Sequence, residues 1–126
     1  MKELTKAELQ VMQYIWKLKK CYLKDVVEAF PSPRPAYTTI STVIRVLVNK
    51  GFVGFESQGK MHEYHARISR QAYFRTHIHS LIRNHFDGSA LSFASFFTGD
   101  RELELGELEE IRQMIDERIE SLKEEA

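Results

Sequence analysis

Residues 36–50 read AYTTISTVIRVLVNK, and this stretch decides the fold because its composition and its periodicity point to different structures. β-Branched residues fill it, and their propensity alone favours a strand. At about 100° per residue, however, the apolar side chains gather on one face and the polar ones on the other. The apolar face consists of Ile40, Val43, Ile44 and Leu47, and the polar face of Thr38, Ser41, Thr42, Arg45 and Asn49. We therefore predict a helix from Tyr37 to Lys50, ended by Gly51.

Two amphipathic segments precede this helix. Thr5-Lys6-Ala7-Glu8 is a capping-box pattern, in which Thr5 and Glu8 satisfy each other's backbone N–H groups, and it predicts a helix running to about Lys19. The apolar spacing of residues 23–30 predicts a second, shorter helix, which the three prolines between residues 31 and 35 prevent from continuing.

Two strands and two more helices are expected after residue 50. Residues 52–58 and 61–66 read as strands joined by the turn Gly59-Lys60. Ser69 can cap a helix that runs to about Phe86. A last helix, from about Leu105 to Lys123, carries apolar residues at helical spacing, so one of its sides must be buried.

Three helices followed by a hairpin is the order of a winged helix. The predicted fold is therefore mostly α-helical with a small β-hairpin. Residues 1–70 are expected to form a winged helix-turn-helix domain, and residues 71–126 a separate helical region.

Charge is divided unevenly along the chain. Its 126 residues carry 18 basic and 18 acidic side chains, and this balance alone argues against a nucleic-acid partner. Residues 1–86, however, hold 14 Lys and Arg against 6 Asp and Glu, whereas residues 87–126 hold 4 against 12. A basic body with an acidic tail suits a phosphate-binding module followed by a segment that avoids phosphates or meets a partner.

Composition also indicates the cellular compartment in which the protein is expected. Cys21 is the only cysteine, which excludes an internal disulfide and a cysteine-based metal cluster and fits a reducing cytoplasm. Apolar runs fall short of the roughly 20 residues that a membrane span needs, and the start lacks a signal-peptide pattern. We expect a cytoplasmic protein without membrane insertion.

Double-stranded DNA is the partner that the fold order and the charge favour. The third helix of a winged helix enters the major groove, where Arg45 can bind a guanine edge and threonine methyls can touch thymine. Lys50 and Lys60 could neutralise phosphates. The predicted DNA-binding residues are Tyr37, Thr38, Thr39, Ser41, Thr42, Arg45, Lys50 and Lys60. The competing interpretation is an ordinary solvated helix face.

Other classes of function have weaker support. The histidines could suggest a metal site or an enzyme, but His77 and His79 lie about 200° apart on a helix, and His62 and His65 lie on opposite faces of a strand. We expect no catalytic site, metal or cofactor. A protein-interaction winged helix or a ligand-sensing regulator remains an alternative, and Cys21 suits a small buried residue better than a redox switch.

Two segments carry a resemblance to a known family. LTKAELQVMQYIW, from residue 4, and TTISTVIRVLVNKGFV, from residue 38, are similar to the first helix and the recognition helix of the penicillinase-repressor family. The region from Phe86 through Phe96 to Ile111 resembles that family's dimerisation region. The chain departs from the family pattern at Thr38 and Val46, and it lacks the paired C-terminal cysteines of the copper-responsive branch.

The resemblance implies a dimeric repressor on a palindromic operator. Residues 71–126 become the dimerisation region, and the implied contact residues are Phe86, Leu91, Phe93, Phe96, Phe97, Leu105, Leu108, Ile111 and Ile115. In members controlled by a membrane sensor protease, a cut at Asn-Phe in this region ends repression. The corresponding bond here is Ser95-Phe96, with serine in place of asparagine, and a membrane sensor protease is the partner that such a cut implies.

Overall fold

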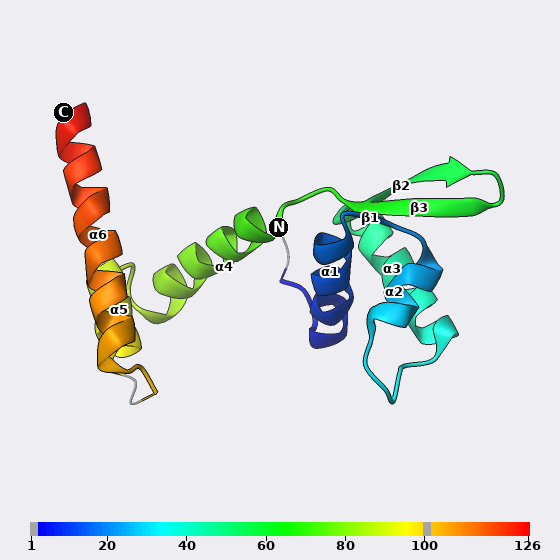
Figure 1. Cartoon of the computed structure of the whole chain (residues 1–126), viewed down its shortest axis with the longest axis horizontal. Helices are drawn as coiled ribbons and strands as arrows, with labels where there is room; N and C mark the ends of the chain where they lie inside the picture. The colour runs from blue at the N-terminus through cyan, green and yellow to red at the C-terminus, as the bar shows by residue number, and fades with distance from the viewer. Residues whose placement is uncertain (1–2, 100–101) are drawn as a thin grey trace. The chain divides into compact units, whose positions relative to one another are not determined.

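A computed structural model of the chain describes residues 3–99 and 102–126. Its elements are α1 (Lys6–Leu18), β1 (Lys20–Cys21), α2 (Leu23–Ala29), α3 (Tyr37–Asn49), β2 (Val53–Gln58), β3 (Met61–Ala66), α4 (Arg70–His85), α5 (Ala90–Thr98) and α6 (Leu105–Glu125) (Figure 1). The chain divides into two compact units, Met1–Ile78 and His79–Ala126, so α4 begins in the first unit and ends in the second. The predicted boundary between residues 70 and 71 lies at the start of α4.

Helix α1 begins at the capping box that the sequence predicts. The Thr5 side chain accepts a hydrogen bond from the Glu8 backbone N–H at 3.2 Å, and the Thr5 N–H donates to the Glu8 carboxylate at 2.9 Å. The helix then turns Val11, Met12 and Ile15 into the core. The predicted start of this helix is therefore confirmed.

Helix α3 forms despite its strand-like composition. It buries Ile40, Ile44 and Leu47, and Ile44 is only 1% exposed. Burial of these three side chains contributes about 5 to 9 kcal/mol. This exceeds the roughly 2 to 4 kcal/mol that the β-branched residues of the helix cost together, at a few tenths of a kcal/mol each. Gly51 follows with a φ of 85°, a conformation that favours glycine, and the helix ends there.

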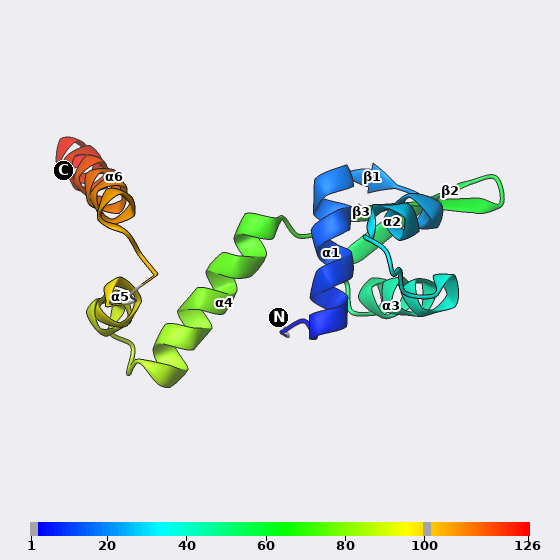
Figure 2. The same ribbon diagram turned by 60° about the horizontal axis from the view of Figure 1, so that its bottom comes forward.

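A three-stranded antiparallel sheet with the order β1-β3-β2 completes the first unit. Strands β2 and β3 form the predicted hairpin, with Gly59 at its turn in a positive-φ conformation. The tip of this hairpin projects past α2 in both views (Figures 1 and 2). Strand β1 is a finding that the sequence did not predict; its Lys20 and Cys21 pair with β3.

The first unit contains a continuous hydrophobic core. Its buried apolar side chains are Leu4, Val11, Met12, Ile15, Cys21, Val26, Phe30, Ile40, Ile44, Leu47, Phe52, Val53 and Tyr73. Only Tyr73 comes from α4, whose N-cap hydroxyl is supplied by Ser69, as predicted. Three helices, a hairpin and the first turn of α4 therefore share one interior.

The second unit is built differently. Helix α5, which the sequence did not assign, is capped by Ser89, whose hydroxyl accepts from the Ser92 N–H at 3.1 Å. Phe86 contacts Phe93 and Phe96, with ring centroids 5.5 and 5.6 Å apart. Neither α5 nor α6 has a buried residue. Within the described part of the chain, no helix is both long and apolar enough to cross a bilayer.

Candidate nucleic-acid interface

The outer face of α3 presents three exposed side chains along one stripe. Thr38, Thr42 and Arg45 are separated by four and three residues, so they lie above one another on the helix surface. Tyr37 and Thr39 are exposed at the first turn, and Ser41 is half-buried. The periodicity of residues 36–50 therefore predicted correctly which side of α3 faces the core and which faces outward.

The Thr42 hydroxyl is already engaged within the helix. It donates a hydrogen bond to the Thr38 backbone carbonyl at 2.9 Å. Its proton is therefore committed, and a bound molecule meets the methyl group of Thr42 and an oxygen that can still accept. This arrangement suits the contact with a thymine methyl that the sequence predicts, and it does not suit donation of a hydrogen bond to a phosphate.

Tyr64, on β3, links the hairpin electrostatically to the outer face of α3. Burial raises the pKa of the Tyr64 hydroxyl, nearby Tyr37 raises it further, and Arg45 opposes the shift. The Tyr64 hydroxyl therefore stays neutral at ordinary pH. Tyr37 and Tyr64 also line the same groove, so the start of α3 and the middle of β3 lie close enough to contact one ligand.

A groove of about 250 Å³ lies where the start of α2, the start of α3 and the hairpin meet. It is lined by Lys24 and Lys60, together with Tyr22, Tyr37 and Tyr64 among others. Two ammonium groups and several phenol rings form a surface suited to a phosphate-rich backbone. Lys24 was not predicted, since nothing in the sequence reveals that the start of α2 lies beside the hairpin.

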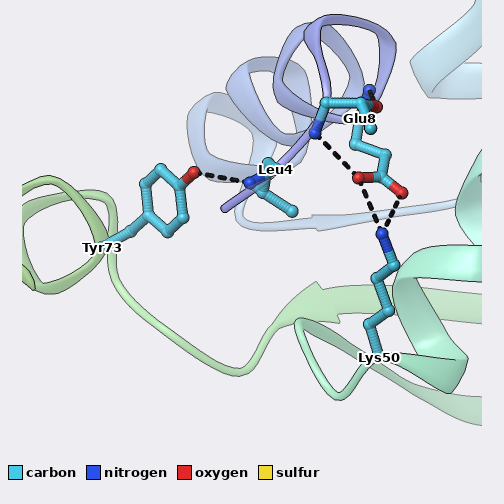
Figure 3. A network of polar contacts seen from close by, with 5 residues as sticks. Leu4, Glu8, Lys50 and Tyr73 are labelled. Carbon is cyan, nitrogen blue, oxygen red and sulfur yellow. Dashed lines mark hydrogen bonds and ion pairs between the residues drawn. The ribbon is translucent and has the colours of Figure 1, made fainter. Parts of the chain in front are cut away.

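Lys50 has a different partner from the one predicted. Its ammonium nitrogen lies 2.8 and 3.0 Å from the two carboxylate oxygens of Glu8, a residue that is buried at the start of α1 (Figure 3). Burial raises the pKa of Glu8, but hydrogen bonds from Lys50 and Thr5 outweigh this, and the pKa is lowered overall. Lys50 therefore compensates a buried charge, which leaves it less suited to a phosphate.

The same network extends to α4. The Tyr73 hydroxyl accepts a hydrogen bond from the Leu4 N–H at 2.8 Å, one residue before the capping box (Figure 3). Backbone and side-chain bonds then join Thr5 to Glu8, and Glu8 to Lys50 at the end of α3. The end of α3 is thus fixed to the start of α1, and α1 to the first turns of α4.

Lys60 occupies the hairpin turn, and Arg45 the middle of α3. Both are exposed, and neither has a carboxylate within ion-pair distance among the described residues. Their charges are therefore available to an external anion. Of the two cations predicted to contact phosphate, Lys60 retains that capacity and Lys50 is occupied.

Metal and thiol chemistry have no site in the described residues. No group of three His, Cys, Asp or Glu side chains is placed to hold a metal ion there. Cys21 is buried, and burial together with Asp25 and Glu63 raises the pKa of its thiol to about 11. The thiol stays protonated at neutral pH and is a poor nucleophile.

The residues of the predicted dimerisation region are mostly exposed. Leu91, Leu105 and Phe96 are 81%, 73% and 72% exposed, and Phe97 and Ile115 are also exposed. Phe86, Phe93, Leu108 and Ile111 are half-buried. Such large apolar side chains in water point to a missing partner. The Ser95-Phe96 bond lies inside α5, where the Ser95 carbonyl accepts from the Gly99 N–H.

Comparisons with known proteins agree with this architecture. The sequence model described as Penicillinase repressor matches residues 4–117. The penicillinase repressor of Bacillus licheniformis is 26% identical over 120 residues, covering 91% of each chain. The methicillin resistance regulatory protein MecI of Mammaliicoccus sciuri is 25% identical over 117 residues, which make up 92% of this chain and 95% of the relative.

A solved structure supports the predicted fold of the first unit. The solution structure of the DNA binding domain of the repressor BlaI is 28% identical and superimposes with a TM-score of 0.50. The match covers 58% of this chain and 94% of that domain. The winged-helix prediction is therefore confirmed.

Proposed function

The chain belongs to the penicillinase repressor family and is a DNA-binding repressor rather than an enzyme, and from this premise we propose that it acts as a homodimer on a palindromic operator. In this proposal, each first unit reads one half-site, and the second unit pairs two copies. Repression takes place where the DNA lies, in the cytoplasm.

The observation that carries the proposal is the two-sided helix α3. Its apolar face is buried in the core, while Thr38, Thr42 and Arg45 form an exposed stripe. In the major groove, Arg45 reads a guanine through its two parallel N–H groups, and the Thr42 methyl contacts a thymine methyl. Tyr37, Thr39 and Ser41 flank this stripe and contact the sugar-phosphate backbone.

Phosphate contacts come from the hairpin and from α2. Lys60 and Lys24 line the groove beside the start of α3, so both reach the backbone when α3 enters the major groove. These contacts set the register of the protein on DNA without reading bases. Lys50 acts indirectly, because its bond to Glu8 holds the end of α3 in place.

Homodimerisation rests on the unburied apolar surface of the second unit. The apolar stripe of α6 continues from Leu105 and Leu108 through Ile111 to Ile115, and α5 adds Leu91, Phe96 and Phe97. A second copy offers the same surface, and a two-fold dimer matches the symmetry of a palindrome. Phe86 and Phe93 support α5 from within the unit.

Release of repression is proposed to follow a cut at Ser95-Phe96 by a membrane sensor protease. The bond lies in a short helix that has no buried residue, and such a helix can open locally at low cost. Loss of Phe96, Phe97 and α6 from the remaining fragment removes most of the apolar dimer surface.

The experiment starts from a random DNA pool, from which the full chain selects its operator. Arg45→Ala is expected to weaken operator binding by about 1 to 3 kcal/mol and to relax the preference at one base pair. Arg75→Ala removes the same charge from an exposed position on α4, outside both α3 and the proposed dimer surface, and serves as the control. Unchanged affinity of Arg45→Ala in a fluorescence-anisotropy titration would contradict the assignment of α3 as the reading helix.

A further inference from the structure

The first unit contains another hollow, whose lining shares no residue with the groove beside α3. A pocket of about 680 Å³ opens where the last turns of α1, the end of β3 and the start of α4 meet. This volume lies within the range of roughly 300–1,000 Å³ that small-molecule sites occupy. All its lining residues belong to the first unit.

One part of this pocket is aromatic and held firmly in place. The Trp16 indole N–H donates to the Ile68 carbonyl at 2.9 Å, and the indole also lies 6.0 Å from the ring of Phe74. Tyr14 contacts the ring of Phe30, with centroids 4.6 Å apart. Because these contacts fix both rings before any ligand arrives, binding against them costs little ordering.

The rest of the pocket is basic. Lys17 and Lys19 line it from the end of α1, and Arg70 lines it from the first turn of α4. Its lining contains no carboxylate, and none of these three cations forms an ion pair with another described residue. Lys50, in contrast, is neutralised by Glu8. The Arg70 guanidinium lies 5.6 Å from the centroid of the Phe74 ring, but no carboxylate of the described residues is paired with any of the three cations, so the pocket favours an anion.

We propose that this pocket binds a small aromatic anion. Its flat apolar body would pack against Tyr14 and Trp16, and its carboxylate would meet Lys17, Lys19 or Arg70. Duplex DNA suits the pocket less well, because its phosphates bring no free ring for the aromatic wall. A neutral aromatic compound would leave the three cations unbalanced.

The position of the pocket suits an effector. Ser69, which lines it, caps α4 by accepting a hydrogen bond from the Ala72 N–H at 3.0 Å, and Arg70 is the first residue of that helix. A ligand bound here contacts the start of the helix that continues into the second unit. A regulatory effect on operator binding rests on the proposed function, whereas ligand binding itself does not.

Trp16 makes the binding test direct, because it is the only tryptophan of the chain and gives a single indole N–H signal in a ¹H–¹⁵N spectrum. Titration of the full chain with 2-naphthoate is expected to shift this signal in a saturable way. The matched neutral probe 2-naphthamide is expected to bind at least several-fold more weakly. No shift with naphthoate, or equal binding of the two probes, would overturn the proposal.

Variants locate the charge that holds the anion. Lys17→Gln and Arg70→Gln are each expected to weaken naphthoate binding about two- to fivefold, the scale of a partly exposed ion pair. Lys6→Gln changes an exposed lysine at the other end of α1 and should leave binding unchanged. If all three variants bind naphthoate like the parent chain, the ligand does not occupy this pocket.

Operator binding supplies the regulatory readout. Naphthoate is expected to change the operator affinity of the parent chain, and to do so less in Arg70→Gln at the same probe concentration. An operator affinity that does not respond to saturating naphthoate overturns the effector role. A chain that binds naphthoate but no operator contradicts the proposed function, while leaving the pocket assignment intact.

Discussion

The two units of this chain handle apolar residues in opposite ways. In the first, isoleucines such as Ile15, Ile40 and Ile44 are at most 1% exposed inside a core made by three helices and a sheet. In the second, Ile115 and Ile119 are 50% and 43% exposed on α6. The first unit contains a core of its own, whereas the apolar side chains of the second would be buried only in the dimer that we propose.

Matched isoleucine substitutions in the two units are expected to give the largest difference in stability. Ile44→Ala empties a packed site and is expected to lower the free energy of unfolding by about 2 to 5 kcal/mol at any protein concentration. Ile115→Ala is expected to lower stability only where dimers form, so its effect should depend on concentration. Thermal unfolding at several concentrations separates the two cases, and a large, concentration-independent loss for Ile115→Ala would break the comparison.

Acidification tests how the first unit is held together. The folded-state pKa of Glu8 is lowered below its ordinary value of 4.5. Its contribution to the free energy of unfolding is therefore complete above that pH and is lost as the pH falls through the folded-state pKa. Glu8→Gln should remove this contribution, which we expect to be about 1 to 2 kcal/mol because Lys50 is one-third exposed and water partly screens the pair.

Denaturant unfolding between pH 3 and pH 7 measures the effect. The exposed Glu28→Gln serves as the control. Equal stability of Glu8→Gln and the parent chain at pH 7 would show that the buried pair does not support α3.

Lys60→Ala is expected to have the smallest effect, and it tests whether the hairpin contacts phosphates while α3 reads bases. Loss of one phosphate contact should weaken binding to operator and random DNA alike, and should reduce the log–log salt slope by about 1. Lys6→Ala removes an exposed lysine outside the interface for comparison. An effect confined to the operator would mean that the hairpin reads bases.

Much of the first unit was predictable because its signals are local. The capping box at Thr5 and Glu8, the two faces of α3 and the turn at Gly59 each depend on residues close in sequence. Strand β1 was missed because two residues leave no periodicity to detect. Helix α5 was missed because its segment, rich in serine and phenylalanine, lacks a clear apolar stripe.

The candidate interface was predictable only in part. Which side of α3 faces outward follows from periodicity, so the exposure of Thr38 and Arg45 was predicted. The ion pair of Lys50 joins residues 42 positions apart, and the approach of Lys24 to the hairpin depends on tertiary packing. Such long-range partners leave no mark in a single sequence.

Truncation after Asp87 tests the central claim, that the first unit reads DNA while the second joins two copies. Every core residue lies at or before Tyr73, so the fragment should fold. Sedimentation equilibrium with the selected operator is expected to show two full-length chains on each duplex. The fragment is expected to be a monomer in the absence of DNA. It should bind the operator roughly 100-fold or more weakly than the full-length chain. A dimeric fragment, or one full-length chain per duplex, would contradict the account.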